Sequence, residues 1–305
     1  MQAQRQQIDG QRWHYQHGPI DLVIRADGDA VAVASAHAAA WHRFERILSE
    51  LVQELPQLRM AVQASSSCCP MQGPVARRMW QACKPYAENF ITPMAAVAGS
   101  VAQEIAACYE RPGIERAWAN NGGDIAMHLQ PGQSLKVGLY ADMARLDAAQ
   151  LQDQLLLDGH FSVDAAMPVR GVASSGWRGR SFSLGIADCV TVLARSAAQA
   201  DAAATVIANA VNVNEARVKR APATTLKDDS DLGQQLVTID VPLLAPALVL
   251  KALQLGLAKA QALQADGLIF SAVLVCQRQA LRTRVDQFLD TSHSIKSEHR
   301  GRIFA

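Results

Sequence analysis

The sequence predicts an α+β protein. Two observations lead to this class: apolar residues recur with helical spacing in a few long segments, and short β-like runs fill the centre of the chain. With half of its 305 residues apolar, the chain can bury one large core or two smaller ones. We expect a single domain over residues 1–305. Residues 227–233, which are charged and turn-rich, form a loop or a joint between two subdomains, and residues 292–305 form a mobile tail.

The first elements are a β-hairpin and a group of helices. Residues 12–26 alternate polar and apolar around a Gly-Pro turn, which predicts a hairpin with one buried face. Residues 29–55 carry apolar side chains at spacings of three and four and predict a helix that ends before Pro56. Residues 75–110 read as two helices interrupted near Pro93, because proline lacks the amide hydrogen that the helix needs.

The centre of the chain is rich in β structure, and helices and strands alternate after it. Short β-like runs are predicted at residues 115–119, 125–129, 135–140, 161–165, 171–174 and 189–194. Ser196 is the expected N-cap of a helix over 197–211. A strand over 236–241, an alanine-rich helix over 244–263 and a strand over 267–276 follow. The alanine-rich helix fits burial against the protein's own sheet and equally against a second subunit in a homo-oligomer.

Composition excludes several classes of partner. Lysine plus arginine (29) nearly balances aspartate plus glutamate (28), so no overall charge attracts nucleic acid or an anionic membrane. The N-terminus lacks the order of a signal peptide and no apolar stretch is long enough to span a bilayer, which predicts a cytoplasmic protein. The six cysteines show no CxxC spacing and read mostly as small buried hydrophobes. Cys68 and Cys69 lie in a serine-rich run, where a mobile loop and a redox or soft-metal role are both open.

Two glycine-containing segments could contact a ligand. The segment Asn120–Asp124 lies between two β-like runs, and its two glycines permit a turn that cradles a ligand or forms an ordinary hairpin. Small hydroxyls and glycines from Ser174 to Asp188, together with Arg178 and Arg180, suit phosphate oxygens. A solvated loop explains the same composition, because neither GxxxxGK[ST] nor GxGxxG is present.

A third candidate is a pair of oxygen ligands. Asp201 and Thr205 stand four residues apart on one helix face, with only alanines between them. Such a pair could hold part of the shell of Mg²⁺, with carbonyls, water and a substrate's phosphates as the remaining ligands. The alternative is structural, since an aspartate in the first turns complements the helix dipole and a threonine can bond back to a carbonyl.

Five blocks in a fixed order resemble the ApbE-like superfamily, whose best-known members are the FAD:protein FMN transferases. The blocks are residues 93–99, 121–124, 174–176, 181–188 and 200–205, and the resemblance spans about residues 12–215. Within the superfamily, the chain is most similar to an uncharacterised branch that lacks the lipoprotein signal. The resemblance implies an ApbE-like, T-fold-like α+β fold, with mixed sheets and helices packed around a central cleft for a flavin nucleotide.

The resemblance also implies roles for individual residues. In the transferases, Mg²⁺ bridges the pyrophosphate of FAD, and FMN passes to a threonine of a partner flavoprotein with release of AMP. Asp201 and Thr205 match the magnesium-binding pair of the Ala-Asp-Ala-x-Ala-Thr motif. The remaining matches would border the nucleotide: the helix start at Ala95 and Ala96, the turn of Asn121, Gly122, Gly123 and Asp124, and the turn of Ser174, Ser175 and Gly176.

The chain departs from the transferase pattern at two places. The His-x-x-Asp-Pro segment is replaced by residues 181–185 without a histidine, and the lysine of the Gly-x-x-Lys-Gly helix start is absent. If a group is transferred, Ser181, Ser183 and Asp188 are the polar residues that would replace the histidine segment. Three hypotheses follow: an Mg²⁺-dependent nucleotidyl or FMN-type transferase acting on FAD or FMN, a non-catalytic flavin-binding or assembly protein, and a cleft rebuilt for an unrelated small molecule.

Overall fold

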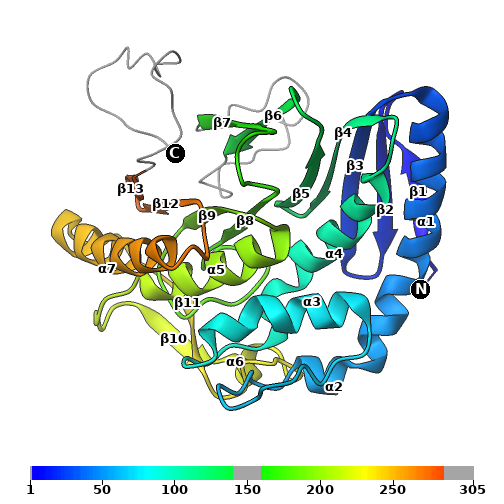
Figure 1. Cartoon of the computed structure of the whole chain (residues 1–305). Coiled ribbons are helices and arrows are strands. Elements are labelled where there is room, and N and C mark those ends of the chain that lie inside the picture. Colours follow the sequence, from blue (N-terminus) through cyan, green and yellow to red (C-terminus); the bar gives the residue numbers. More distant parts are fainter. Residues whose placement is uncertain (1, 140–158, 285–305) are drawn as a thin grey trace, which may run out of the picture.

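A nine-stranded antiparallel sheet forms the centre of the protein (Figure 1). The computed structural model describes residues 2–139 and 159–284. The strands of this sheet, in spatial order, are β1 (Gln4–Gln7), β2 (Arg12–His17), β3 (Ile20–Gly28), β4 (Ile114–Asn121), β5 (Asp124–Leu129), β8 (Gly171–Ser175), β9 (Cys189–Ala194), β12 (Ser271–Cys276) and β13 (Gln279–Arg282). Two-stranded ribbons pair β6 (Ser134–Leu139) with β7 (Gly159–Asp164) and β10 (Lys219–Pro222) with β11 (Leu236–Asp240).

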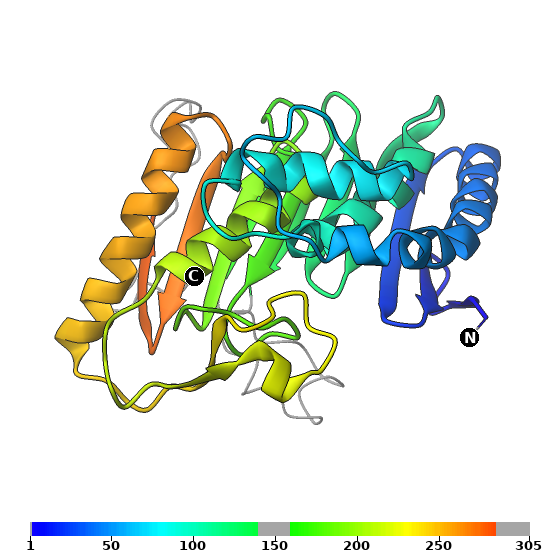
Figure 2. The ribbon, with the colours of Figure 1, turned by 90° about the horizontal axis from the view of Figure 1, so that it is seen from below.

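Helices cover one face of the sheet. The longer ones are α1 (Ala30–Gln53), α3 (Pro74–Cys83), α4 (Val97–Ala106), α5 (Ala197–Ala210) and α7 (Pro246–Ala265). Four of them, α1, α4, α5 and α7, lie over the sheet, and α3 packs on α4 and α5 (Figure 2). The short helices are α2 (Leu55–Leu58), α6 (Ala223–Leu226), η1 (Lys84–Tyr86), η2 (Pro93–Ala96) and η3 (Ala107–Tyr109). No helix in residues 2–139 and 159–284 combines the length and the apolar character needed to cross a membrane.

The sheet separates two hydrophobic cores. Along β5, Ala126 belongs to the large core under the helices, whereas Met127 belongs to a smaller core beneath the β6–β7 ribbon. On β8, Ala173 belongs to the large core and Val172 to the smaller one. Alternate side chains of a strand point to opposite faces, so both faces of the central strands are covered and their sequences read as continuous apolar runs.

The predicted α+β class is confirmed, and most predicted elements are present. Strands β2 and β3 form the expected hairpin, and α1 begins after Asp29, whose carboxylate accepts hydrogen bonds from Val31 N (3.0 Å) and Ala32 N (2.9 Å). Ser196 caps α5 as predicted, accepting from Gln199 N at 3.3 Å. The interruption near Pro93 is also present, as η2 followed by α4.

Some elements differ from the sequence prediction. Strand β1 was not predicted, because it lies at a sheet edge with all of its residues exposed and therefore shows no apolar alternation. The sequence did not predict the short elements β10, β13, α2 and α6, because their apolar residues show no periodic pattern. The last long strand begins at Ser271 and not at Gly267, because Gly267 (φ +71°) ends α7 and Leu268 N donates to Leu263 O at 2.9 Å. The expected tail at 292–305 lies outside the described residues.

Residues 227–233 connect α6 with β11 and contact the helical layer. Asp229 pairs with Arg59 (2.6 Å), and Asp231 accepts a short hydrogen bond from Thr92 Oγ1. These contacts anchor the segment at two points. Cys68 is exposed and Cys69 half-buried in the loop between α2 and α3, and the redox or metal role of this pair stays a prediction.

A buried ion-pair network fixes α1, α3 and α4 to one another. Glu104 of α4 accepts from Arg43 Nε (2.6 Å) and from Arg78 Nη1 (2.8 Å), with 13% of its side chain exposed. Burial raises the pKa of Glu104, but the hydrogen bonds from the two arginines outweigh burial and hold the pKa below its ordinary value. A depressed pKa means that this carboxylate stabilises the fold above the unfolded-state pKa, and the contribution is lost as pH falls through the folded-state pKa.

We expect Glu104→Gln to lower the free energy of unfolding at pH 7 by about 2–3 kcal/mol, since two partly buried guanidinium groups lose their counter-charge. Urea unfolding at pH 7 and at pH 4 measures the effect, which should shrink at the lower pH. Glu45→Gln is the matched control, because Glu45 is exposed on α1. An equal loss in both variants, or an effect that grows on acidification, would contradict this interpretation.

Candidate functional site

The site is built where α4 crosses α5. Gly99 permits this crossing, because a Cβ at that position would lie 2.3 Å from Ala197 O and 2.9 Å from Asp201 Cβ. The backbones therefore approach more closely than any larger residue allows. As a result, Asp201, in the second turn of α5, lies directly against the first turn of α4.

Asp201 satisfies the amino end of α4. Its Oδ2 accepts a hydrogen bond from Gly99 N at 2.9 Å, and the backbone at Ala98 also favours the charged form of the carboxyl group. Helix α4 has no side-chain cap of its own at Ala96. Asp201 is 9% exposed, so burial disfavours its charged form, and the amides at the start of α4 oppose this effect in part.

The turn between β4 and β5 supplies a second carboxylate. Asn121 pairs with Asp124 across the hairpin, and Gly122 (φ +64°) and Gly123 (φ +112°) form its two-residue loop. The backbone of this motif therefore has the geometry of an ordinary β-hairpin, one of the two predicted alternatives. Asn121 Nδ2 donates to Ala98 O at 3.2 Å, which ties the turn to the start of α4.

Asp124 turns inward from this hairpin and meets Asp201. It is 7% exposed, and its Oδ1 accepts from Ser174 N of β8 at 3.1 Å. The two carboxyl groups lie close enough to act on each other's pKa. Burial raises the pKa of Asp124 to about 7, and burial together with the charge of Asp124 raises the pKa of Asp201 well above its ordinary value. Two neighbouring buried carboxyl groups cannot both be ionised unless a cation lies between them; without a cation, at least one of them holds a proton.

Thr205 lies one turn beyond Asp201 on α5. It is half-buried, and within the described residues its hydroxyl makes no hydrogen bond. Asp124, Asp201 and Thr205 all offer oxygen atoms, the donor type that hard cations such as Mg²⁺ prefer. The donor chemistry therefore fits a hard divalent cation, although the described ranges contain no group of three His, Cys, Asp or Glu residues arranged around one ion position.

The family model described as "AbpE bacteria" matches residues 4–285, which is most of the chain. The chain belongs to this family. The membership confirms the ApbE-like resemblance drawn from the five sequence blocks. Nearly all of the described structure, including the turn at Asp124 and the helix with Asp201, lies inside the matched range.

Several relatives of the chain carry the name UPF0280 protein. The one from Methanopyrus kandleri is 35% identical over 205 residues, which cover 66% of this chain and 75% of that protein. The one from Methanosarcina barkeri is 30% identical over 207 residues, with coverage of 68% and 75%. The one from Methanothrix thermoacetophila is 36% identical over 142 residues, and the match spans 52% of that relative.

Two solved structures resemble the chain over most of its length. The apo form of flavinyl transferase ApbE from Pseudomonas stutzeri is 13% identical with a TM-score of 0.46, and the match covers 93% of this chain and 95% of that one. A mutant of flavin transferase ApbE from Vibrio cholerae is 12% identical with a TM-score of 0.43, with coverage of 93% and 98%. Likeness at this level assigns no role to any residue.

In this AbpE-family chain, the remaining predicted ligand contacts are distributed around the carboxyl pair. Ala95 is half-buried and Ala96 fully buried in η2, immediately before α4. Ser174 hydrogen-bonds Thr191 through its hydroxyl (3.0 Å). The turn after Ser175 brings the backbones together, since a Cβ at Gly176 would lie 2.3 Å from Asp188 O. Glycine at 176 is thus required by packing, whether or not a ligand binds there.

Two of the three predicted catalytic residues already have structural partners. Ser183 is 2% exposed, and its hydroxyl donates to Asn209 Oδ1 (3.1 Å) and accepts from Gly185 N (3.2 Å). Asp188 accepts from Trp177 Nε1 (3.2 Å) and from Gln277 N (2.5 Å), and so holds the β12–β13 turn in place. Ser181 is exposed and directly follows Arg180 in the chain. Catalytic roles for these residues stay predictions, with Ser181 the most accessible of the three.

The structure distinguishes Arg180 from Arg178, whereas the sequence predicted both arginines together as donors to phosphate oxygens. Arg180 extends from the loop after β8 to the glycine turn, where a Cβ at Gly122 would lie 1.5 Å from its Nη2. Its charge acts on Asp124. The Asp124–Asp201 contact was also missed, because the two residues belonged to separate motifs. The only sequence signal was that each motif placed one carboxylate among small residues.

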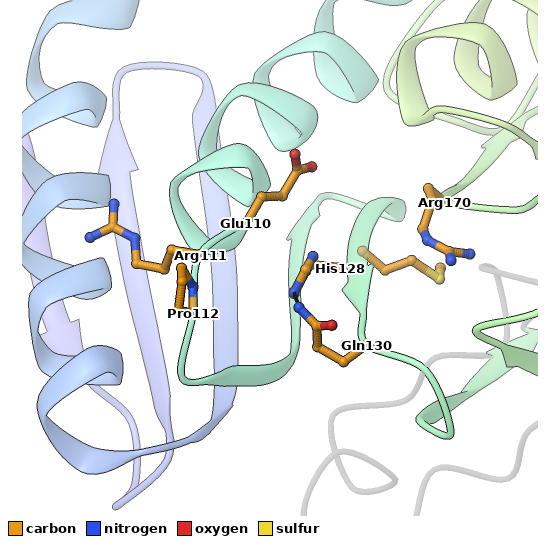
Figure 3. Close-up of a pocket in the computed structure, with 7 residues that line it drawn as sticks. Glu110, Arg111, Pro112, His128, Gln130 and Arg170 are labelled. Atoms are coloured by element: carbon orange, nitrogen blue, oxygen red, sulfur yellow. Dashed lines mark hydrogen bonds between the residues drawn. The ribbon is translucent and has the colours of Figure 1, made fainter.

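A separate surface hollow of about 510 Å³ lies at the opposite end of β5 (Figure 3). It contains no residue predicted for the site. One of its arginines, Arg170, donates to the carbonyl oxygens of Ala165, Met167 and Val169 and is committed to the backbone. The hollow is lined by Glu110, Arg111, Pro112, Met127, His128, Gln130 and Arg170.

Proposed function

We propose that this protein binds a flavin nucleotide, or another small molecule with a phosphate group, together with Mg²⁺ at Asp124, Asp201 and Thr205. The buried contact between the two carboxyl groups carries the proposal, because this arrangement needs either a proton or a cation to be stable. Family membership and the match of residues 200–205 to the magnesium-binding motif support the cation. The two glycines of the turn next to Asp124 are exposed to solvent.

Mg²⁺ bound at these oxygens would attract phosphate oxygens and reduce the charge that builds up on a diphosphate when it is cleaved. The chain's own residues hold the two carboxyl groups in fixed positions. Gly99 and Ala98 hold Asp201 in place, and Ser174 N holds Asp124. Both carboxylates therefore face each other at fixed positions before any ligand arrives, which reduces the ordering cost of binding.

A transferase of the FMN-transferring type is the first candidate, and a non-catalytic flavin-binding or assembly protein is the second. The engagement of Ser183 and Asp188 in hydrogen bonds to Asn209, Gly185, Trp177 and Gln277 favours the second. Ser181 is compatible with the first, because it is exposed and no structural partner occupies its hydroxyl in the described residues. The third reading, a cleft rebuilt for another phosphorylated molecule, differs only in the ligand.

Incubation with FAD and Mg²⁺ separates the candidates. Release of AMP, measured by liquid chromatography, identifies a transferase or a pyrophosphatase, and native mass spectrometry identifies any FMN left on the protein. Binding of FAD without AMP supports the non-catalytic candidate. If neither FAD nor FMN binds in the presence of Mg²⁺, while another phosphorylated molecule does, the cleft serves that molecule instead. If no phosphorylated molecule binds, the proposal is wrong.

Mg²⁺ affinity should rise as pH increases through about 7, since protons on the carboxyl pair compete with the cation and the pKa of Asp124 is raised to about 7. We expect excess Mg²⁺ to raise the melting temperature clearly at pH 8 and hardly at pH 5.5. Thermal unfolding at both pH values, with and without Mg²⁺, measures this, and Ca²⁺ and Na⁺ serve as ion controls. A stabilisation that is equal at the two pH values would exclude the carboxyl pair as the ligand.

A further inference from the structure

We propose that Arg180 binds the anionic group of the ligand, a phosphate or diphosphate, against the glycine turn between β4 and β5. The inference rests on the proposed function, because it concerns the ligand of the same site. Arg180 thereby becomes the residue that distinguishes phosphorylated from unphosphorylated molecules.

The two glycines of the turn, Gly122 and Gly123, leave different amounts of space around Arg180. An ideal Cβ at Gly122 would lie 1.5 Å from Arg180 Nη2 and 2.8 Å from its Cζ, so the guanidinium fills the space that a side chain at 122 would need. An ideal Cβ at Gly123 meets no atom within 4 Å. Glycine at 122 thus makes room for the arginine, while the surface over Gly123 remains open for a ligand.

The guanidinium is available for binding. Arg180 is exposed, and in the part of the chain that the structure describes it has neither a hydrogen-bond acceptor nor an ion-pair partner. Its donors face water, which a phosphate can replace with two parallel charge-assisted hydrogen bonds. The preceding arginine differs: Arg178 Nε lies 3.5 Å from Asp188 Oδ1, and its guanidinium stacks over the Trp177 ring at 4.9 Å.

The positive charge of Arg180 also reduces the electrostatic repulsion between the acidic groups of the site and a phosphate. Burial of Asp124 and Asp201 places acidic groups directly under the turn, which would repel an approaching phosphate. Burial raises the pKa of Asp124, and the positive charge of Arg180 opposes that rise, as expected for a guanidinium near this carboxyl group. Arg180 therefore offsets part of the negative charge that a phosphate meets at the turn.

The ligand chemistry follows from this geometry. A planar guanidinium matches the geometry of phosphate oxygens, which accept two parallel charge-assisted hydrogen bonds from it. FMN and riboflavin share the flavin ring and differ by one phosphate, so Arg180 should affect the first and not the second. Inorganic pyrophosphate tests the anion subsite without any flavin contact.

Isothermal titration of the wild-type chain and three variants, all with excess Mg²⁺, tests the proposal. The probes are pyrophosphate, FMN and riboflavin. Arg180→Gln should weaken pyrophosphate and FMN by about 10- to 100-fold, the usual effect of losing a charge-assisted pair of hydrogen bonds, and leave riboflavin within about twofold. Arg180→Lys should recover part of the loss. Arg178→Gln, which removes the same charge from the same loop, should change pyrophosphate affinity by less than about threefold.

Each outcome is decisive. Equal pyrophosphate affinity in Arg180→Gln and wild type overturns the inference and leaves the proposed function standing. An equal loss for Arg178→Gln means that loop charge, and not the contact with the turn, attracts the anion, and this too overturns it. A loss for riboflavin as large as that for FMN removes the phosphate subsite. If the wild type binds none of the probes with Mg²⁺, the inference is wrong, and the proposed function then depends on whether FAD or another phosphorylated molecule binds.

Discussion

Asp201→Asn is expected to abolish Mg²⁺-dependent stabilisation and to weaken binding of FMN or pyrophosphate by at least about 100-fold, because the remaining carboxylate cannot hold the cation alone. Asparagine keeps the shape of the side chain. Its oxygen can still accept from Gly99 N, and its amide can donate to Asp124, so the fold should survive. The change therefore removes charge and little else.

The same variant should be more stable than wild type when no cation is present. Both carboxyl groups have raised pKa values, so between the unfolded-state pKa near 4 and the folded-state value the folded protein holds protons that the unfolded chain releases. Stability of the wild type is therefore lost as pH rises through about 7. Removing one acid removes the repulsion, and we expect the melting temperature at pH 8 without cation to rise by about 3–6 °C.

Calorimetry of both proteins at pH 5.5 and pH 8, with and without Mg²⁺, measures these effects. Asp228→Asn is the control, because Asp228 is an exposed carboxylate in the 227–233 segment. A cation-free Asp201→Asn protein that is less stable than wild type at pH 8 would mean that capping of α4 outweighs charge repulsion. Retained Mg²⁺ stabilisation would place the cation elsewhere.

Gly99→Ala is expected to be among the most destabilising single-methyl additions in the chain. An alanine raises helix propensity by roughly 0.5–1 kcal/mol in the interior of a helix. The new Cβ, however, would lie 2.3 Å from Ala197 O, which is backbone and cannot move aside without separating α4 from α5. Overpacking typically costs about 1–3 kcal/mol, and a clash with backbone lies at the upper end of that range, so the steric effect wins.

We expect the melting temperature of Gly99→Ala to fall by about 6–12 °C and its Mg²⁺ response to weaken, since Asp201 would move away from the α4 amides. Thermal unfolding with and without Mg²⁺ measures both effects. Gly10→Ala adds the same methyl group where no atom lies within 4 Å, and its melting temperature should stay within about 1 °C of wild type. Unchanged stability in Gly99→Ala would show that the two helices do not cross closely at this point.

Local patterns predicted most of the elements. Alternation in residues 12–26 and helical spacing in residues 29–55 correspond to β2, β3 and α1 with boundaries close to those observed. Elements without an apolar face, such as β1, gave no such pattern. A strand exposed on both sides at a sheet edge is held by backbone hydrogen bonds to β2, and these leave no trace in side-chain periodicity.

Only part of the candidate site could be predicted from the sequence, for a similar reason. Asn121–Asp124 and Asp201 are surrounded by small residues in the sequence, a pattern that favours a ligand site, and both lie at the candidate site. Ser183 and Asp188 were chosen for their polarity, and the structure gives both of them packing partners remote in sequence, Asn209 and Gln277. A polar side chain in a glycine-rich segment looks the same from sequence whether it faces a ligand or supports the backbone.

The α+β class, the tight glycine turn and a lone aspartate on an alanine-rich helix face can be predicted from sequence patterns. These are local properties, because backbone freedom and apolar periodicity depend on neighbours within a few residues. The shared buried position of Asp124 and Asp201, and the place of Arg180 over Gly122, depend on how distant segments pack. Those contacts follow from the order of β4, β5 and β8 in the sheet and from the crossing of α4 and α5 at Gly99, which join segments far apart in the chain.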